Sequence, residues 1–556
     1  MWLLALAAAL VPSPGARSGV WTRTRGVVYA AIDTDADWAA LDAWLDEGAG
    51  RTTNEETLPP NRRWTLTSAG HVHESFYAKK SWQDAGAGER LSANVARLGY
   101  PQPSAVQVAS FKPILEGNDV LLAYPSGMGK TLAFLGPVCQ RLWELEAEHG
   151  RTPKGQVRAI ILVPTNDLGQ QVLEMARDVS NGKITATIAT GEHKWQSQRK
   201  KLRNGVDLLV TTMGRLIAHL MPRDREPSFR LDGLRMLVVD EASSLYHGRL
   251  PSWLERQKRE EGLEVDDEMC YLGEQPAVGR GVQSSHKSYI QGPTRAMWCI
   301  LRSEMPDECA TTLVTNALQE AVEDEMLSDF PSLRVIKSRG LHTTRKGVDV
   351  TLIDCSRGIW KPDEERPSLF EAKLAELRAA LDDSRHALVL CNTDRSIERI
   401  EREIRNGPEG TGAICSGGVC VQRDVYAFHS SLTAETRAAA LVGFRRTADG
   451  EAGDGGAAEH DGGDPRVLVA TGRAVRGLDL SAGPCRPIDL VVLFDFAPDA
   501  KAYLARTGCA TRGDAAPAKV TALAVRSQLK FARALMSNDQ AGMPHALHAE
   551  EDLHVE

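Results

Sequence analysis

The chain has 556 residues, which is long enough for several domains. Its hydrophobic content of 42% and charged content of 25% are ordinary for a soluble globular protein. The net charge of −8 excludes a bulk basic surface, so any nucleic-acid site must be a local patch. The 10 cysteines are scattered, with Cys415 and Cys420 as the only close pair, so incidental thiols in a reducing compartment are expected rather than a zinc site.

The first 32 residues predict a targeting segment. Residues 2–11 are apolar, but the run is far shorter than the ~20 residues that span a bilayer, and no membrane association is expected. Arginines follow, and no acidic residue precedes Asp33, as in a transit peptide. A plastid or mitochondrial location is therefore favoured, with the cytoplasm or nucleus as the alternative. Residues 33–80 are expected to form an N-terminal extension.

A rigid turn precedes the first clear motif. Helical periodicity over residues 91–98 ends at Gly99 and Pro101, and Ser104 is placed to cap the next helix. Gln107 follows in that helix, and its amide could read an adenine edge because it both donates and accepts hydrogen bonds. Taken alone, Gln107 is more often an ordinary surface residue.

Residues 121–131 predict a phosphate-binding loop. A short apolar strand is followed by Pro-Ser-Gly-Met-Gly and then by Lys130 and Thr131, which open a helical pattern. Gly127 and Gly129 allow the backbone N–H groups to face a phosphate, Lys130 can reach the β- and γ-phosphates, and the Thr131 hydroxyl can complete a magnesium shell. Tyr124 stands where the pattern usually starts with glycine, so an ordinary strand-to-helix turn is the alternative.

Three further strands, at residues 157–163, 206–210 and 236–239, alternate with helical segments and predict a doubly wound parallel sheet with ligands at the strand carboxyl ends. The last of them runs into Asp240 and Glu241. One carboxylate there can hold magnesium, and its neighbour can orient or deprotonate an attacking water.

The predicted organisation has two such α/β domains. The first spans residues 81–340, with a charged insertion at about 246–308 and a strand at 311–314. The second spans residues 348–530, with strands at 350–354, 387–390, 425–429, 467–470 and 489–494. An acidic loop at 448–464 and a tail at 537–556 are expected to be disordered.

From about residue 81 to about residue 526 the chain resembles a DEAD-box RNA helicase of superfamily 2. The resemblance implies two tandem RecA-like domains that close over ATP and single-stranded RNA. The matching segments are Gly99 to Gln107 (Q motif), Ser126 to Thr131 (motif I), Pro164 to Leu168 (Ia), Thr212 to Arg215, Asp240 to Ser243 (II), Leu390 to Thr393 (IV), Ala470 to Asp479 (V) and Tyr503 to Arg512 (VI).

Site residues follow from these matches. The expected catalytic residues are Lys130, Asp240, Glu241 and Arg512. ATP is expected to contact Trp82, whose ring would stack on adenine, together with Gln107, Ser126, Gly127, Met128, Gly129, Lys130, Thr131 and Asp479, and Mg²⁺ is expected at Thr131 and Asp240. RNA is expected at Pro164, Thr165, Thr212, Gly214, Arg215, Arg437 and Thr471.

The chain departs from the family pattern at several positions. Motif III, usually Ser-Ala-Thr, is Thr315-Asn316-Ala317, which puts the coupling of hydrolysis to domain closure in doubt. In motif VI, Ala505 replaces histidine and Cys509 replaces one of two arginine fingers. An arginine finger is worth ~10³–10⁵ in rate in phosphoryl transfer. Outside motifs III and VI, five other positions differ from the usual residue. Arginine, glycine, proline, glutamine and aspartate are replaced, in this order, by Asn166, Glu192, Met213, Ala434 and Gly472.

Two functions remain open at this point. The first is a monomeric ATP-dependent RNA helicase that remodels single-stranded or structured RNA, with ribonucleoprotein partners. The second is an ATP-gated RNA clamp or assembly factor that barely hydrolyses ATP, which Asn316, Ala505 and Cys509 favour. A DNA-directed translocase is disfavoured by the Q-motif match.

Overall fold

The structure is a computed structural model. It describes residues 21–24, 27–30, 63–68, 76–222, 226–246, 297–298, 301–356, 368–406, 413–416, 419–445, 465–480, 487–510 and 518–547. Residues 1–61 form one compact unit and residues 62–556 another. In the first unit the described residues make a two-stranded antiparallel hairpin, β1 (Trp21–Thr24) and β2 (Val27–Ala30).

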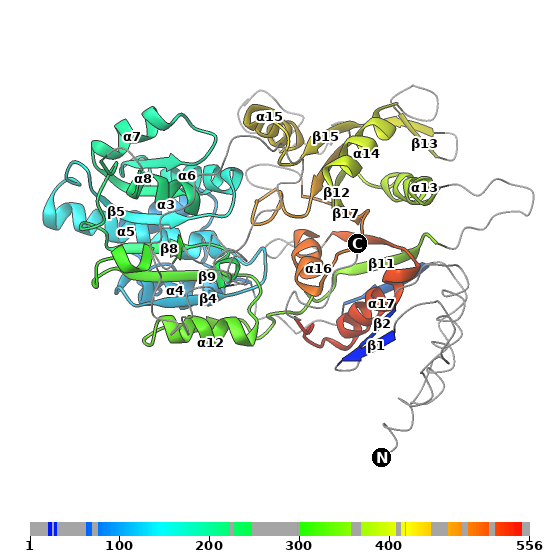
Figure 1. The fold of residues 1–556 in the computed structure, drawn as a ribbon, viewed down its shortest axis with the longest axis horizontal. Coiled ribbons are helices and arrows are strands. Elements are labelled where there is room, and N and C mark those ends of the chain that lie inside the picture. Colours follow the sequence, from blue (N-terminus) through cyan, green and yellow to red (C-terminus); the bar gives the residue numbers. More distant parts are fainter. Residues whose placement is uncertain are drawn as a thin grey trace, which may run out of the picture. The chain divides into compact units, whose positions relative to one another are not determined.

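The larger unit contains two seven-stranded sheets (Figure 1). The first sheet, which defines the first domain, is parallel throughout and has the order β10-β4-β9-β8-β5-β7-β6. Its strands are β4 (Val120–Ala123), β5 (Val157–Leu162), β6 (Ala186–Ala189), β7 (Val206–Thr211), β8 (Met236–Val239), β9 (Ala310–Thr315) and β10 (Arg334–Lys337). Strands β4, β5 and β8 are buried along their whole length, as expected for a parallel sheet covered on both faces.

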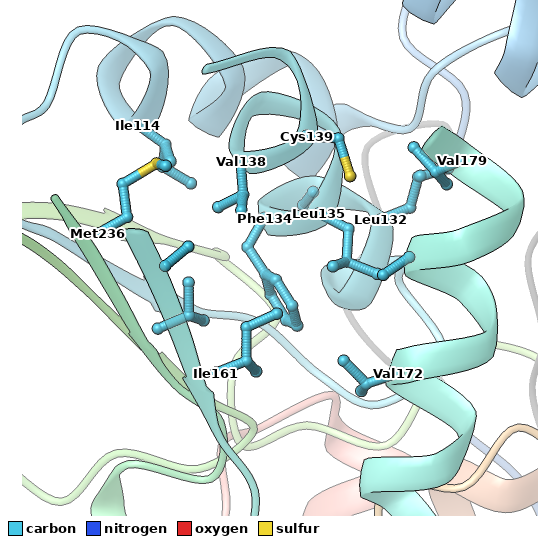
Figure 2. Packing of buried hydrophobic residues seen from close by; sticks show 14 of the residues in the cluster. Ile114, Leu132, Phe134, Leu135, Val138, Cys139, Ile161, Val172, Val179 and Met236 are labelled. Atoms are coloured by element: carbon cyan, nitrogen blue, oxygen red, sulfur yellow. The ribbon is translucent and has the colours of Figure 1, made fainter. Parts of the chain in front are cut away.

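Helices accompany this sheet. They are α3 (Glu89–Arg97), α4 (Ala105–Leu115), α5 (Lys130–His149), α6 (Asn166–Ser180), α7 (Trp195–Arg203), α8 (Met213–Leu220), α9 (Ser243–Tyr246) and α12 (Glu320–Asp329). Figure 2 shows Phe134 of α5 packed between Ile161 of β5 and Val172 of α6. Phe134 is completely buried, so truncating a residue of this kind to alanine costs about 3–5 kcal/mol.

The second sheet defines the second domain and has the order β15-β16-β12-β17-β18-β11-β3. Its strands are β11 (Asp349–Asp354), β12 (His386–Cys391), β15 (Asp424–Phe428), β16 (Arg466–Thr471), β17 (Leu490–Leu493), β18 (Lys519–Ala524) and β3 (Arg63–Thr67). Its helices are α13 (Leu369–Leu381), α14 (Asp394–Asn406), α15 (Ala434–Arg445), α16 (Ala500–Thr507) and α17 (Arg526–Ala541), with a 3₁₀ turn η1 (Gly508–Ala510) after α16 and a hairpin β13 (Ala413–Ser416) and β14 (Val419–Gln422). Two tandem, mostly parallel α/β sheets confirm the predicted fold class.

The expected N-terminal extension contributes a strand to the second domain. β3 pairs antiparallel with β11, and Thr67 donates a 2.5 Å hydrogen bond to Asp349. The sequence pattern did not reveal it because an edge strand of five residues that alternates exposed and half-buried positions carries little hydrophobic signal. The strands β6, β10 and β18 were also not predicted from the sequence.

Two expected boundaries need correction. The tail predicted from residue 537 begins inside α17, and Asp539 and His545 are buried, with a 2.8 Å contact between them. Within the stretch predicted as an insertion, Trp298 and Leu301 are buried in the core of the first domain. The acidic loop at 448–464 and most of the first 32 residues lie outside the described residues. Among the described helices, none is long and apolar enough to cross a membrane.

Candidate functional site

Four neighbouring strands of the first domain end within two residues of one another. Ala123 of β4 pairs with Thr315 of β9, and Val239 of β8 pairs with both Leu313 of β9 and Leu162 of β5. The segments that follow these strands are the phosphate-binding loop, Asn316, Asp240-Glu241 and the stretch that begins at Val163. The carboxyl edge of one parallel sheet therefore carries the predicted phosphate loop and acidic pair of this domain, as in other open α/β sheets.

The loop between β4 and α5 has the backbone geometry of a phosphate cradle. Gly127 and Gly129 have φ of 77° and 84°, in the left-handed region that favours glycine. A Cβ on Gly129 would lie 2.8 Å from Nε2 of Gln107, so a side chain there would collide. Lys130 opens α5, and its Nζ donates 2.9 Å hydrogen bonds to the carbonyl oxygens of Tyr124 and Pro125. The ammonium is thus held inside the loop by contacts that a phosphate could replace.

Gln107 supports this loop directly. It is 5% exposed, its Oε1 accepts from the Ser104 amide at 2.7 Å, and its Nε2 donates to the Gly129 carbonyl at 3.2 Å. The Ser104 hydroxyl donates to the Met128 carbonyl at 3.1 Å. In this conformation Nε2 of Gln107 holds the loop and Oε1 accepts from the residue that caps α4, so adenine reading would need both ends of the amide to exchange partners.

Trp82 is packed into the core of the first domain. Its side chain is 2% exposed, its indole N–H donates to the Tyr100 carbonyl at 2.8 Å, and its ring packs edge-on against Phe111 at 6.5 Å between centroids. No indole face is free here, so stacking on adenine would require the ring to turn outward.

A buried charge cluster lies beside the loop. Burial and the neighbouring Glu241 carboxylate raise the pKa of Asp240 to about 7, and the Lys130 ammonium opposes the rise. Burial lowers the pKa of Lys130, and the carboxylates of Glu241 and Asp240 oppose that shift. The predicted lysine and acidic pair thus lie close enough to influence one another. Glu241 is buried, whereas Asp240 and Lys130 are half-buried. When both carboxylates are ionised they leave an excess negative charge over the one ammonium, which a divalent cation would offset.

Motif III contacts motif II. The amide of Asn316 donates a 2.9 Å hydrogen bond to Oε1 of Glu241, and Thr315 Oγ1 lies 3.1 Å from Oγ of Ser243. Glu241 is 5% exposed and has a φ of 54°, unusual for a residue with a side chain. Asn316 was noted in the sequence as a departure only, since no pattern shows that its amide reaches a carboxylate.

The predicted RNA residues of the first domain lie after β5 and β7, which pair directly. Thr165 caps α6 by accepting from the Leu168 amide, while Pro164 and Gly214 are exposed. Thr212 precedes α8, and Arg215 donates to the Gly191 carbonyl at 3.1 Å and lies over the Trp195 ring. These groups lie at the same edge of the first sheet as the nucleotide loop, with β9 and β8 between β4 and β5.

Arg437 of α15 joins the two domains. Its guanidinium contacts both carboxylate oxygens of Asp167, at 3.0 and 3.2 Å, and also contacts Glu192 and the Leu432 carbonyl. Its side chain is 5% exposed, so in this conformation Arg437 pairs with first-domain carboxylates instead of offering itself to RNA. Glu192, where the family has glycine, is a site residue that the sequence flagged without assigning a partner.

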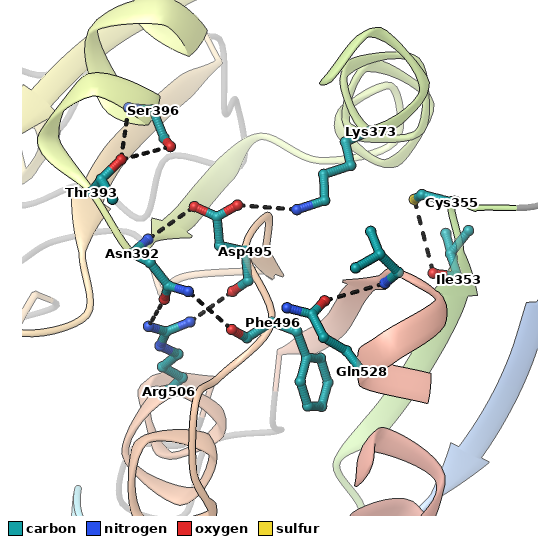
Figure 3. A network of polar contacts seen from close by, with 11 residues as sticks. Ile353, Cys355, Lys373, Asn392, Thr393, Ser396, Asp495, Phe496, Arg506 and Gln528 are labelled. Carbon is teal, nitrogen blue, oxygen red and sulfur yellow. Dashed lines mark hydrogen bonds and ion pairs between the residues drawn. The ribbon is translucent and has the colours of Figure 1, made fainter. Parts of the chain in front are cut away.

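Motif VI is divided between a core network and the domain boundary. In Figure 3, Arg506 bonds to Oδ1 of Asn392 at 2.5 Å and to the Asp495 carbonyl at 2.7 Å, and Asp495 pairs with Lys373 at 3.0 Å. Cys509 packs against the second-domain core, and burial raises its pKa to about 11. Arg512, the expected finger, lies outside the described residues.

Motif V contributes two further predicted residues. The backbone N–H of Asp479 donates to Oε1 of Gln171 in the first domain at 2.7 Å, so this predicted nucleotide residue lies at the domain boundary. Thr471 ends β16, and its hydroxyl accepts from the Ala474 amide at 3.2 Å.

The described residues include no group of three or more His, Cys, Asp or Glu side chains that could hold a metal. A magnesium ion here would therefore rely on Asp240, the Thr131 hydroxyl and the phosphates of a nucleotide, which is the usual way Mg²⁺ binds in such sites.

Comparison with known proteins matches residues 104–260 to the DEAD/DEAH box helicase family model. Over 487 residues the chain is 26% identical to DEAD-box ATP-dependent RNA helicase 50 of Oryza sativa subsp. japonica, covering 86% of this chain and 64% of that protein. The helicase of the same name from Arabidopsis thaliana is 26% identical, covering 94% of this chain and 55% of that protein. The chain thus spans less than two thirds of the length of these relatives.

Solved structures show the same fold. S. cerevisiae Dbp5 bound to RNA and ADP BeF3 has a TM-score of 0.57 at 16% identity, covering 84% of this chain and 94% of that one. DEAD-box helicase Mss116 bound to ssRNA and UDP-BeF also has a TM-score of 0.57 at 16% identity, covering 86% and 82%. The chain carries a DEAD/DEAH box helicase domain and is related to DEAD-box RNA helicases.

The charge cluster makes a prediction for the metal-free protein. The pKa of Asp240 is raised from 3.8 to about 7 on folding, so between these values the folded chain binds more protons than the unfolded chain. The stability contributed by this group is therefore lost as the pH rises through that window. Asp240→Asn, which cannot ionise, should raise the Tm in EDTA at pH 8 by about 2–4 °C, the effect of about 1 kcal/mol in a domain of this size, and should change it little at pH 4.

Differential scanning fluorimetry at the two pH values measures this, with the exposed Asp232→Asn as the matched control. A lower Tm for Asp240→Asn at pH 8 would contradict the electrostatic assignment.

Proposed function

We propose that this chain is an ATP-dependent RNA helicase or RNA–protein remodelling ATPase that binds single-stranded RNA through its backbone. One observation carries the proposal: the nucleotide loop, the acidic pair and the predicted RNA residues of the first domain follow parallel strands at one edge of its sheet, and a second domain of the same fold contacts that edge. The relatives' names support ATP as substrate and RNA as partner. Ribonucleoprotein partners, a monomeric state and an organelle location are further parts of the proposal.

ATP would bind with its phosphates in the loop that contains Gly127 and Gly129. Lys130 would exchange its two carbonyl contacts for phosphate oxygens, which costs little because the loop geometry is retained. Asp240 and Thr131 would hold Mg²⁺, which supplies positive charge that the buried carboxylates and the phosphates share.

Glu241 would orient or deprotonate the attacking water. Asn316 donates to one of its oxygens, so one carboxylate oxygen is held by the protein and the other is left for water. This arrangement fits a well-oriented attacking water.

RNA would lie over the loops after β5 and β7 and against the second domain at Arg437 and Thr471. Threonine hydroxyls, a glycine backbone and arginine are phosphate and sugar contacts rather than readers of base edges, so little sequence preference is expected. Arg437 would exchange one of its carboxylates for an RNA phosphate.

The second candidate is an ATP-gated RNA clamp with little hydrolysis. Ala505 and Cys509 favour it, because neither side chain can supply the positive charge that the family places in motif VI. The two candidates differ in turnover and not in binding, so steady-state kinetics separates them.

The proposal predicts weak ATPase activity that single-stranded RNA stimulates. Cys509→Arg should raise the stimulated kcat by about tenfold, well below the ~10³–10⁵ of an optimal finger, because residue 509 packs toward the core and the new side chain must reach around the helix. Coupled-enzyme ATPase assays with and without RNA measure this, with Lys130→Ala as the inactive control. Absence of stimulation in both proteins would favour the clamp, and absence of ATP binding would exclude both candidates.

Removing the motif III amide should impair hydrolysis without weakening nucleotide binding. Asn316→Ala leaves the buried Glu241 carboxylate without its 2.9 Å donor, so we expect kcat to fall about tenfold with the KM for ATP nearly unchanged. Asn316→Asp, which places a second carboxylate against Glu241, should lower kcat at least as much. An Asn316→Ala enzyme with wild-type kcat would show that the contact has no catalytic consequence.

We expect the wild-type Glu192 carboxylate to lower the affinity of the protein for RNA. Glu192→Gln removes a negative charge from the predicted RNA path and releases one partner of Arg437, so RNA affinity should rise about threefold. Fluorescence anisotropy with a labelled single strand at fixed salt measures this, with the exposed Glu226→Gln as control. Unchanged or weaker RNA binding by Glu192→Gln would place Glu192 outside the RNA path.

A further inference from the structure

A small cavity separates the nucleotide loop from motif VI. Its volume is about 30 Å³, enough for a water molecule or two, and Ser126, Asn316, Lys501, Ala505 and Gly508 are among the residues that line it. The domains meet closely at this place, since a Cβ on Gly508 would lie 3.1 Å from Cβ of Ser126. The side chains of α16 that line this cavity therefore face the loop that would hold the phosphates.

Lys501 is the basic residue of α16 that lines this cavity. Its Nζ lies 3.4 Å from Oγ of Ser243, which contacts Thr315 and stands two residues after Glu241. The side chain is half-buried, so its charge is only partly screened by solvent. Arg345, from the connection between the domains, also lines the cavity.

The other motif VI side chains that the structure describes cannot supply this charge. Arg506 is held in the second-domain core by Asn392 and Asp495, as Figure 3 shows. Cys509 packs against the same core, and Ala505 ends at its Cβ. Lys501 lies one helical turn before Ala505, so the two share the face of α16 that lines the cavity, and the short alanine leaves room for the lysine.

We propose that Lys501 is a cationic contact from the second domain to the terminal phosphate of the nucleotide. The inference rests on the proposed function, because it places ATP in the loop after β4. On nucleotide binding the flexible lysine would leave the Ser243 hydroxyl and contact the phosphate. A cation placed where negative charge develops stabilises the transition state and also links phosphate occupancy to the approach of the second domain.

The test compares Lys501→Met, which keeps the length and removes the charge, with Lys501→Arg, which keeps the charge. Lys530→Ala is the matched control, because Lys530 is an exposed lysine of the same domain that does not line the cavity. The readouts are the affinity for mant-ADP with and without beryllium fluoride, in the presence of single-stranded RNA, and the RNA-stimulated kcat. Thermal melting checks that each variant is folded.

Lys501→Met should bind the mant-ADP–beryllium fluoride complex about tenfold more weakly while its affinity for mant-ADP stays within about twofold, because only the former mimics the terminal phosphate. The kcat of Lys501→Met should fall by a factor of about 10². Lys501→Arg should recover most of the lost kcat and most of the lost affinity for the beryllium fluoride complex. Wild-type values for Lys501→Met would overturn the inference and leave the proposed function intact. Failure of the wild-type protein itself to bind either ligand would overturn both.

Discussion

The buried cluster of Lys130, Asp240 and Glu241 is the constraint on which the rest of the site depends. Such charges are costly away from water unless they are paired. Here they are brought together because β4 and β8 flank β9 and end within two residues of each other along it. Once both carboxylates are ionised, the cluster carries more negative than positive charge. The apolar strands thus create a site whose charge a divalent cation would offset.

Strands and motif positions could be predicted from this sequence more readily than an edge strand or the packing of a side chain. The strands before the glycine loop and before Asp240 are apolar, buried and bounded by turn residues, so both the sheet and the motif positions could be read from the pattern. β3 was not predicted, because Trp64 and Leu66 are the only apolar side chains of this five-residue strand and give too short a pattern. The predicted adenine stacking of Trp82 shows a second limit: spacing places an aromatic residue, but only packing decides whether its face is free.

Long-range side-chain partners were beyond sequence reasoning for a physical reason. Asn316 was visible as a departure, yet its contact with Glu241 depends on two strands separated by 75 positions ending side by side. Arg437 was assigned to RNA, whereas it is held by Asp167 and Glu192 across the domain boundary. Residues that depart from the family pattern lie next to other residues of the site. Glu192 pairs with the retained Arg437, and the short Ala505 lines the same cavity as Lys501.

The pairing of β3 with the second domain bears on how the two domains can move. The chain passes between the two sheets twice, once after β3 and once between β10 and β11. The two connections are hydrogen-bonded to each other: the Ser68 amide donates to the Val348 carbonyl, and the Gly347 amide donates to the Ser68 carbonyl. The end of the second connection is also tied to the C-terminal segment, because the His545 amide donates to the His342 carbonyl and His545 pairs with Asp539, which accepts from Tyr503 of α16. A double connection of this kind permits rotation but limits separation. Opening of the nucleotide cleft is therefore expected to pivot about residues 342–348, which places the largest displacement at Arg437 and the RNA edge rather than at the phosphate loop.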